Sequence, residues 1–334
     1  MLRRGKKRDT TRLLREEAVG PQTRTRYAIA LERFNLFLAF YLISTLSLFV
    51  DPKFTDAHAA DYIQWLYSHD CPMQWAADLL SAISDKYPNL RKELNSGWRS
   101  FAAWKRIEPP IRARPLSALV FQMLLFAILP LADDTNVYQI FSFVAYCGLL
   151  FSGLLRPSEV RHLLWSDISL EVIDGKPTIS IAIENSKTSA RKFITEHVTI
   201  FDVFLFLILL QLRSWNLSEY VWPYSKTCFA QIFKLWLAIA GLSGYTPYSF
   251  KRGGATSAFL KHRNYDRLCN DGRWSSVTAA RNYLDDAMSS LVRMKTPARH
   301  PRTRQYLLRF MRRMLQLHQI EVSVDALESL ILEI

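Results

Sequence analysis

The chain has 334 residues, of which 49% are hydrophobic and 22% are charged, a composition that excludes extensive disorder and can bury a core. Its length fits about two domains. There are 43 Lys and Arg residues against 30 Asp and Glu residues, which gives a net charge of +13 and a pI near 9.6. An excess of this size favours a polyanionic partner, with nucleic acid ahead of a membrane surface.

Cysteine usage and apolar stretches exclude further classes. The four cysteines lie far apart and form no CxxC pair, which argues against a zinc site or a disulfide framework and is typical of a reducing compartment. The basic start of the chain has no apolar core and is not a secretory signal. The uncharged stretches 34–50 and 140–155 fall short of the roughly 20 apolar residues of a membrane span, so we interpret them as buried core helices.

The first half of the chain is predicted to be a helical bundle. After a polar, basic arm at 1–20, apolar residues recur every three or four positions between 21 and 105, with no strand signal. Asp56 is a candidate cap for the second helix of this bundle. Three prolines and two arginines in 107–115 then indicate an extended, semi-rigid linker.

The second half is predicted to be mainly helical with one small antiparallel sheet. Two apolar helices are followed by a hairpin around Asp174-Gly175, whose isoleucines alternate on one face. A third strand follows, and Gly241 is expected to close the first of the later helices. The helices are predicted at 118–129, 137–150, 227–240, 251–262, 276–286 and 303–318, and the third strand at 193–200.

The segment SGLLRPSEVRHLLWSDI, residues 152–168, carries a candidate phosphate clamp. Pro157 suits the first position of a helix and Glu159 its first turn, so Arg156 is expected at the helix N-terminus. A guanidinium beside unpaired backbone N–H groups can hold a phosphate. The alternative is a surface arginine that simply pairs with Glu159.

Two more segments place cations beside turns. ENSKTSARKF, residues 184–193, puts Lys187 at the tip of a predicted hairpin, where most lysines are only solvated. YTPYSFKRGGATSAF, residues 245–259, puts Lys251 and Arg252 in the first turn of a helix. The following glycine pair costs helix stability, which indicates a close approach of another backbone. The alternative is an ordinary glycine-rich turn.

The fourth segment, GRWSSVTAARNYLDDA at 272–287, presents a candidate nucleophile. Ser275 or Ser276 can cap the helix that carries Tyr283. Because the chain has 14 tyrosines, any one of them is usually half-buried packing. The spacing from Trp274 to Tyr283 distinguishes this one.

In this order, the four segments resemble the tyrosine recombinase/integrase family, particularly its eukaryotic mobile-element branches of DIRS and Crypton type. The family has an arginine box with an acidic neighbour, a hairpin lysine, an HxxR box followed by Ala-Thr, a His or Trp box, and a tyrosine nine residues later. Ala255-Thr256 anchors the third box, in which Tyr248 and Lys251 replace the histidine and the arginine. The other matches are Arg156, Glu159, Lys187, Trp274 and Tyr283, with Arg252 beside the second-arginine position.

The resemblance implies a fold and a domain order. It implies an all-α core-binding domain followed by an α+β catalytic domain, which close around DNA. The boundaries are a basic arm at 1–20, a core-binding domain at 21–106, a linker at 107–116, a catalytic domain at 117–300 and a C-terminal helical segment at 301–334.

It also implies a site-specific DNA recombinase that breaks and rejoins strands without ATP, metal or cofactor. Tyr283 would attack the phosphodiester and form a 3′-phosphotyrosyl intermediate, while Arg156 and Lys251, or Arg252, would neutralise the phosphorane. Lys187 would be the general acid. The chain has no P-loop, and its seven histidines form no ligand-spaced cluster. The partners implied are double-stranded DNA and three further copies in a homotetramer on two sites, with no membrane.

The two departures from the family pattern leave alternatives open. A catalytically decayed mobile-element protein would keep DNA binding without cleavage, and a type IB topoisomerase would use similar chemistry. The expected location is the nucleus in a eukaryotic host and otherwise the cytoplasm with the nucleoid.

The basic clusters generate a first prediction. Eight Lys and Arg residues and no acidic residue lie in 288–320, and five more lie between Arg99 and Arg114. If they grip phosphates, DNA affinity falls steeply with salt because counterions are released. Neutralising one of them is expected to reduce the log–log slope by roughly one. Fluorescence anisotropy over a salt series measures the slope, and a flat dependence would remove DNA as the main partner.

Overall fold

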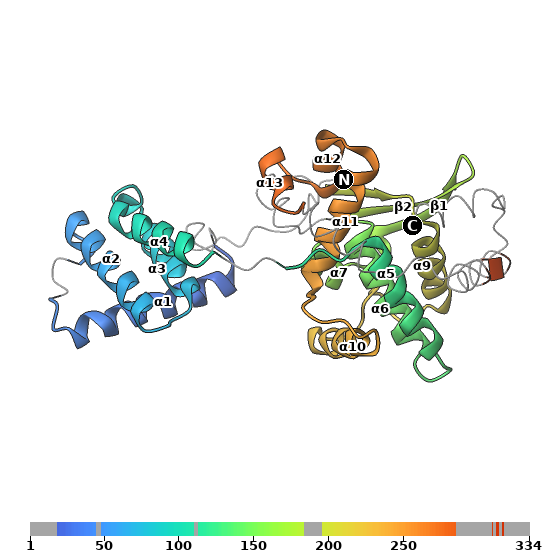
Figure 1. Cartoon of the computed structure of the whole chain (residues 1–334), viewed down its shortest axis with the longest axis horizontal. Coiled ribbons are helices and arrows are strands. Elements are labelled where there is room, and N and C mark those ends of the chain that lie inside the picture. Colours follow the sequence, from blue (N-terminus) through green and yellow to red (C-terminus); the bar gives the residue numbers. More distant parts are fainter. Residues whose placement is uncertain are drawn as a thin grey trace, which may run out of the picture. The chain divides into compact units, whose positions relative to one another are not determined.

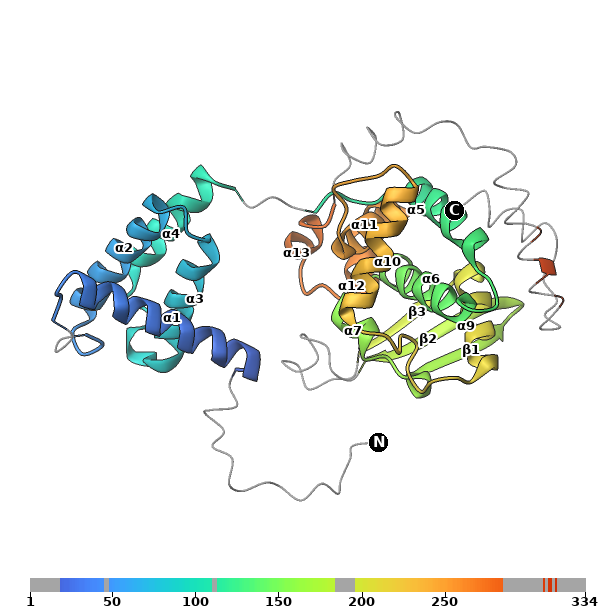
Figure 2. The same ribbon diagram turned by 90° about the horizontal axis from the view of Figure 1, so that it is seen from below.

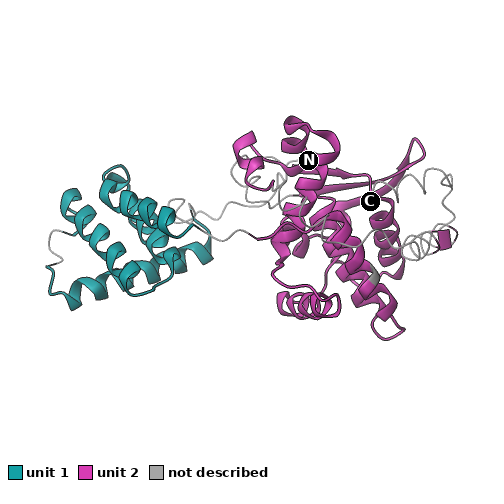
Figure 3. Ribbon diagram, in the orientation of Figure 1, with its two compact units in different colours: residues 1–111 teal, residues 112–334 magenta. Residues whose placement is uncertain are grey.

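A computed structural model describes residues 19–44, 48–109, 113–183 and 196–284, with four isolated helical positions at 309, 312, 313 and 316. The chain divides into two compact units, residues 1–111 and 112–334 (Figure 3). The division falls inside the proline-rich stretch that was predicted as a linker. Each unit has its own hydrophobic core.

In the described residues of unit 1, all regular elements are helices. Proline occupies the first turn of α1 and α2, where its missing N–H has no partner to lose. Phe34, Leu38, Ile63, Leu66 and Leu79 are among the residues that fill its core. The elements are α1 (Pro21–Phe40), α2 (Pro52–Ser68), α3 (Met73–Lys86), the 3-10 turn η1 (Pro88–Leu90) and α4 (Asn95–Ile107).

The cap expected at Asp56 was wrong for α2. Asp51 begins that helix and accepts a hydrogen bond from the Lys53 N–H. Asp56 lies one turn further on, is buried, and accepts from the backbone N–H groups of Ser96 and Gly97 at 2.9 and 2.8 Å. It therefore caps α4, where a carboxylate also suits the positive end of the helix dipole.

Unit 2 combines helices with one small sheet, which confirms the predicted fold class (Figures 1 and 2). The two helices predicted at 118–129 and 137–150 are confirmed to within one residue. No helix in the described ranges is long and apolar enough to cross a membrane. The elements are α5 (Ala118–Ile128), η2 (Leu129–Leu131), α6 (Val137–Phe151), α7 (Pro157–Arg161), η3 (Trp165–Asp167), β1 (Ile168–Ile173), β2 (Lys176–Ile183), β3 (Glu196–Ile200), α9 (Val203–Trp215), α10 (Lys226–Ile239), α11 (Pro247–His262), α12 (Tyr265–Gly272) and α13 (Val277–Arg281).

The sheet has the order β1-β2-β3 with both neighbouring pairs antiparallel. Asp174 and Gly175 both have positive φ, at 50° and 71°, as a tight hairpin turn requires. Ile179, Ile181 and Ile183 alternate onto the buried face of β2. The predicted hairpin is confirmed, and the third strand begins at Glu196 within the described residues.

Helix α11 approaches neighbouring backbone very closely at its glycine pair. A Cβ atom at Gly253 would lie 1.7 Å from the Leu116 carbonyl oxygen, and one at Gly254 would lie 2.0 Å from the Phe151 carbonyl oxygen. The Leu116 N–H also donates to the Ser249 carbonyl at 3.0 Å. The close approach expected of this pair is therefore confirmed, and it seats α11 against the end of α6 and the start of α5.

This contact generates a stability prediction. Gly253→Ala is expected to destabilise unit 2 by about 3 kcal/mol or more, because the added methyl group meets a carbonyl oxygen that belongs to rigid backbone. Urea unfolding followed by far-ultraviolet circular dichroism measures the change. Ser257→Ala, on the same helix, is the control and should leave stability nearly unchanged. Equal stability of the two variants would contradict the close packing.

Candidate active site

Arg156 caps the N-terminus of α7, as the sequence predicted. Pro157 holds the first helical position, and the Tyr146 hydroxyl donates to the Pro157 carbonyl at 2.7 Å, which ties α7 to the buried helix α6. The Glu159 carboxylate accepts from the Arg156 backbone N–H at 2.7 Å and from Arg156 Nη1 at 2.6 Å. The expected pairing with Glu159 is thus present, and it fixes a largely buried arginine at a helix start.

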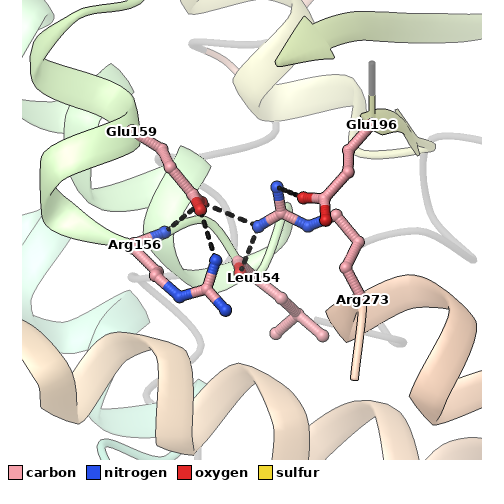
Figure 4. A network of polar contacts seen from close by, with 5 residues as sticks. All are labelled: Leu154, Arg156, Glu159, Glu196 and Arg273. Atoms are coloured by element: carbon pink, nitrogen blue, oxygen red, sulfur yellow. Dashed lines mark hydrogen bonds and ion pairs between the residues drawn. The ribbon is translucent and has the colours of Figure 1, made fainter. Parts of the chain in front are cut away.

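Glu159 also binds Arg273, a residue that the sequence analysis missed (Figure 4). Arg273 Nη2 donates to Glu159 Oε2 at 2.7 Å and to the Leu154 carbonyl at 3.4 Å, while Nη1 lies 3.4 Å from Glu196 Oε2. Arg273 is only 6% exposed. Burial alone would raise the pKa of Glu159, but the charge of Arg273 and the hydrogen bonds from both arginines outweigh it and lower that pKa. The carboxylate is therefore ionised at neutral pH.

Lys251 lies fully buried in the first turns of α11. Its Nζ lies 5.2 Å from the centre of the Trp274 ring and 5.7 Å from the centre of the Tyr283 ring. Burial and, after it, the positive charges of Arg273 and Arg156 together lower the pKa of Lys251 to about 7, against a smaller opposite effect of Glu159 and Glu196.

Tyr283 follows directly after α13 and packs on Trp274, with ring centroids 4.7 Å apart. Ser276 caps α13 through the Ala279 N–H, which confirms one of the two predicted caps, but the helix ends at Arg281 rather than at 286. From α11, Arg252 Nη1 donates to the Asn282 carbonyl at 3.2 Å. The nucleophile candidate is therefore held between α11 and the Trp274 ring.

The structure brings together most of the residues that the motifs singled out. Arg156, Glu159, Lys251, Trp274 and Tyr283 form one cluster, and Lys251 rather than Arg252 lies against the two rings. That difference follows from helix phase, since neighbouring side chains point about 100° apart.

One described site candidate lies outside this cluster. Tyr248 is 48% exposed, and in the described part of the chain no hydrogen bond or ring contact joins it to the cluster. Lys187 falls in 184–195, outside the described residues.

Three buried donors in this cluster lack an acceptor among the described residues. They are Lys251 Nζ, Arg273 Nε and Trp274 Nε1. An unsatisfied buried donor costs about 1–3 kcal/mol, so each of these donors favours the binding of an acceptor. A phosphate offers several oxygens and a negative charge, which suits the amine of Lys251 and the nearby guanidinium of Arg156. Within the described ranges, no group of His, Cys, Asp or Glu side chains could hold a metal ion.

No protein-family model matches the sequence, and no curated protein sequence is similar to it. Solved structures are similar in fold. A lambda integrase dimer bound to a COC′ core site gives a TM-score of 0.53 at 16% identity, covering 86% of this chain and 94% of that chain. The Tn1549 transposon integrase in complex with transposon right end DNA also gives 0.53, at 14% identity, covering 83% and 94%. The chain has the fold of the tyrosine recombinases and integrases, as its four motifs predicted. The DIRS and Crypton branch stays a prediction.

The lowered pKa of Lys251 predicts how stability changes with pH. Below pH 7 the folded state must bury a charged amine, whereas above the ordinary lysine pKa of 10.5 neither state carries that charge. Between these values the unfolded chain binds more protons, so this group makes stability rise with pH. Lys251→Met is expected to be more stable than the parent at pH 7, with a difference that shrinks as the pH rises. Urea unfolding at several pH values measures this, and a constant difference would show that Lys251 has an ordinary pKa.

Proposed function

We propose that this protein is a site-specific DNA recombinase or integrase that cuts and rejoins strands through Tyr283. The observation that carries the proposal is the cluster around Tyr283, in which buried cations and unsatisfied donors surround a phenol in a chain with the tyrosine recombinase fold. A cationic pocket beside a nucleophile is what a phosphodiester requires, since its non-bridging oxygens must be neutralised during attack.

In the proposed step, Tyr283 Oη attacks phosphorus and the bond from phosphorus to the 5′ oxygen breaks. The phenol releases its proton to water, and the 5′ oxygen gains one from a general acid, a role that the family resemblance gives to Lys187. Arg156 and Lys251 hold the non-bridging oxygens. The phosphotyrosyl ester conserves the energy of the broken bond, so rejoining by a 5′ hydroxyl needs no nucleotide.

The proposed partner is double-stranded DNA. The net charge of +13 supports this, and the lambda and Tn1549 integrases are themselves seen with DNA. Recombination joins two duplexes, each cut on both strands, so we propose four copies on two sites. A mobile-element origin, and with it the nucleus of a eukaryotic host, belongs to the same proposal.

A suicide substrate tests the proposed function. A nick beside the cleavage position lets the cut fragment diffuse away, so the parent should accumulate an SDS-resistant protein–DNA adduct, and EDTA should not prevent it. Tyr283→Phe should bind DNA normally and form no adduct, because only the hydroxyl is lost. Tyr265→Phe, on α12, is the matched control and should keep full activity. An adduct in the Tyr283→Phe variant would move the nucleophile elsewhere. Binding without any adduct in the parent would indicate a decayed DNA-binding protein.

A further inference from the structure

Arg273 occupies a backbone position that usually goes to glycine. It caps α12 with φ at 57°, in the left-handed region where a side chain costs roughly 1 kcal/mol or more. Gly272 comes directly before it, where a Cβ atom would lie 2.0 Å from the Trp274 ring. The glycine therefore occupies position 272, where the Trp274 ring leaves no space for a Cβ atom, and the strained left-handed backbone conformation falls on Arg273. Strain of this kind persists only where the surrounding contacts hold the residue in place.

The Arg273 side chain provides those contacts. Its guanidinium is buried and bridges two carboxylates from different elements, Glu159 on α7 and Glu196 on β3 (Figure 4). Both arginines use the Glu159 carboxylate, with Arg273 on Oε2 and Arg156 Nη1 on Oε1. The orientation of one arginine thus depends on the other through a shared carboxylate.

Arg273 also acts on Lys251. After burial, its charge is the largest influence that lowers the pKa of Lys251, ahead of Arg156. The charged groups that act on Lys251 come from three elements: Arg156 and Glu159 from α7, Glu196 from β3, and Arg273 from the end of α12. Tyr283 and Trp274 face it with their rings.

On the basis of the proposed function, we infer that Arg273 is a positioning residue for strand cleavage. It shares Glu159 with Arg156, so Arg156 stays fixed at the start of α7 to meet the phosphate that Tyr283 attacks. Its charge also adds to the effect of burial on Lys251, which lies in the same pocket beside the Trp274 and Tyr283 rings. Arg273 acts through these two cations and does not itself need to touch DNA.

Two substitutions separate the two effects. Arg273→Lys keeps the charge but loses the planar fork that reaches two carboxylates at once. Arg273→Gln loses the charge as well. Arg267→Gln is the matched control, because Arg267 lies on α12, which Arg273 caps, but is 53% exposed and contacts only Asp271 at 3.8 Å and His262 at 3.5 Å through its side chain in the described ranges.

The measurement is single-turnover cleavage of the suicide substrate on both sides of pH 7. Its amplitude reports the folded, competent fraction, and its rate constant reports the chemistry. Arg273→Lys should lower the rate constant on the order of 10²-fold, as expected when a reacting group shifts by about 1 Å. Amplitude, DNA affinity and pH profile should stay as in the parent. The Arg267→Gln control should keep the parent rate.

Arg273→Gln should add a change in the pH profile. The parent rate should fall as pH rises and Lys251 loses its proton. Without the charge of Arg273, Lys251 keeps its proton to higher pH, so the decrease in the cleavage rate constant should occur at a higher pH. A purely structural role would reduce the amplitude of both variants and leave this profile in place.

The outcomes separate this inference from the proposed function. A parent that forms no adduct overturns the proposed function and the inference with it. A parent that cleaves, with Arg273→Lys cleaving at the same rate constant, overturns the inference alone. A reduced rate constant with an unmoved profile in Arg273→Gln overturns the action on Lys251. If Arg273→Gln does not fold, the pH profile of Glu196→Gln tests the electrostatic control of Lys251 instead. Losing the Glu196 carboxylate should move the decrease in the cleavage rate constant to lower pH.

Discussion

The site depends on one shared carboxylate. Glu159 accepts hydrogen bonds from Arg156 and Arg273, and Arg273 also pairs with Glu196. With Lys251, the pocket therefore contains three cationic side chains and two carboxylates. A buried charge without a partner is expensive, and arginine cannot release its proton. Lysine can release its proton, so the excess positive charge of the pocket is reduced by a lower pKa at Lys251. The pocket is left with donors that an incoming anion would satisfy.

The scaffold holds this arrangement with backbone contacts rather than flexible side chains. Glycines at 253 and 254 let α11 touch the carbonyls of Leu116 and Phe151, and a residue with any Cβ atom would push the helix away. Because α11 carries Lys251, that displacement would also move the amine from the rings of Trp274 and Tyr283. The close packing of α11 in unit 2 therefore also fixes the position of Lys251 in the site.

Sequence patterns predicted what depends on local spacing. The helices near 118 and 137, the hairpin at Asp174-Gly175, the α7 start at Arg156 and the cap at Ser276 all follow from residues within a few positions of one another. Partners that lie far apart along the chain were missed. Asp56 caps a helix 40 residues away, and Arg273 meets Glu159 from 114 residues away.

The place of Tyr248 could not be predicted either. The third motif predicts that Lys251 and Arg252 lie in the first turn of a helix over 251–262, whereas α11 begins at Pro247 and therefore includes Tyr248. Tyr248 turns to solvent and Lys251 turns inward, three residues apart. On the same helix, Gly253 and Gly254 lie against the backbone of Leu116 and Phe151, contacts that only the assembled fold shows.

A lysine at the second-arginine position changes the physics of the pocket rather than only weakening it. An arginine there would add a permanent third cation beside Arg156 and Arg273, with two carboxylates to balance them. Lys251 has a pKa that burial and its cationic neighbours lower to about 7, so it can release the charge that an arginine would keep. A phosphate bound beside it would raise that pKa by the same electrostatics that the arginines use to lower it. Lys251 therefore becomes fully protonated only when the anion is bound. The free protein does not have to bury the full charge of Lys251 beside Arg156 and Arg273.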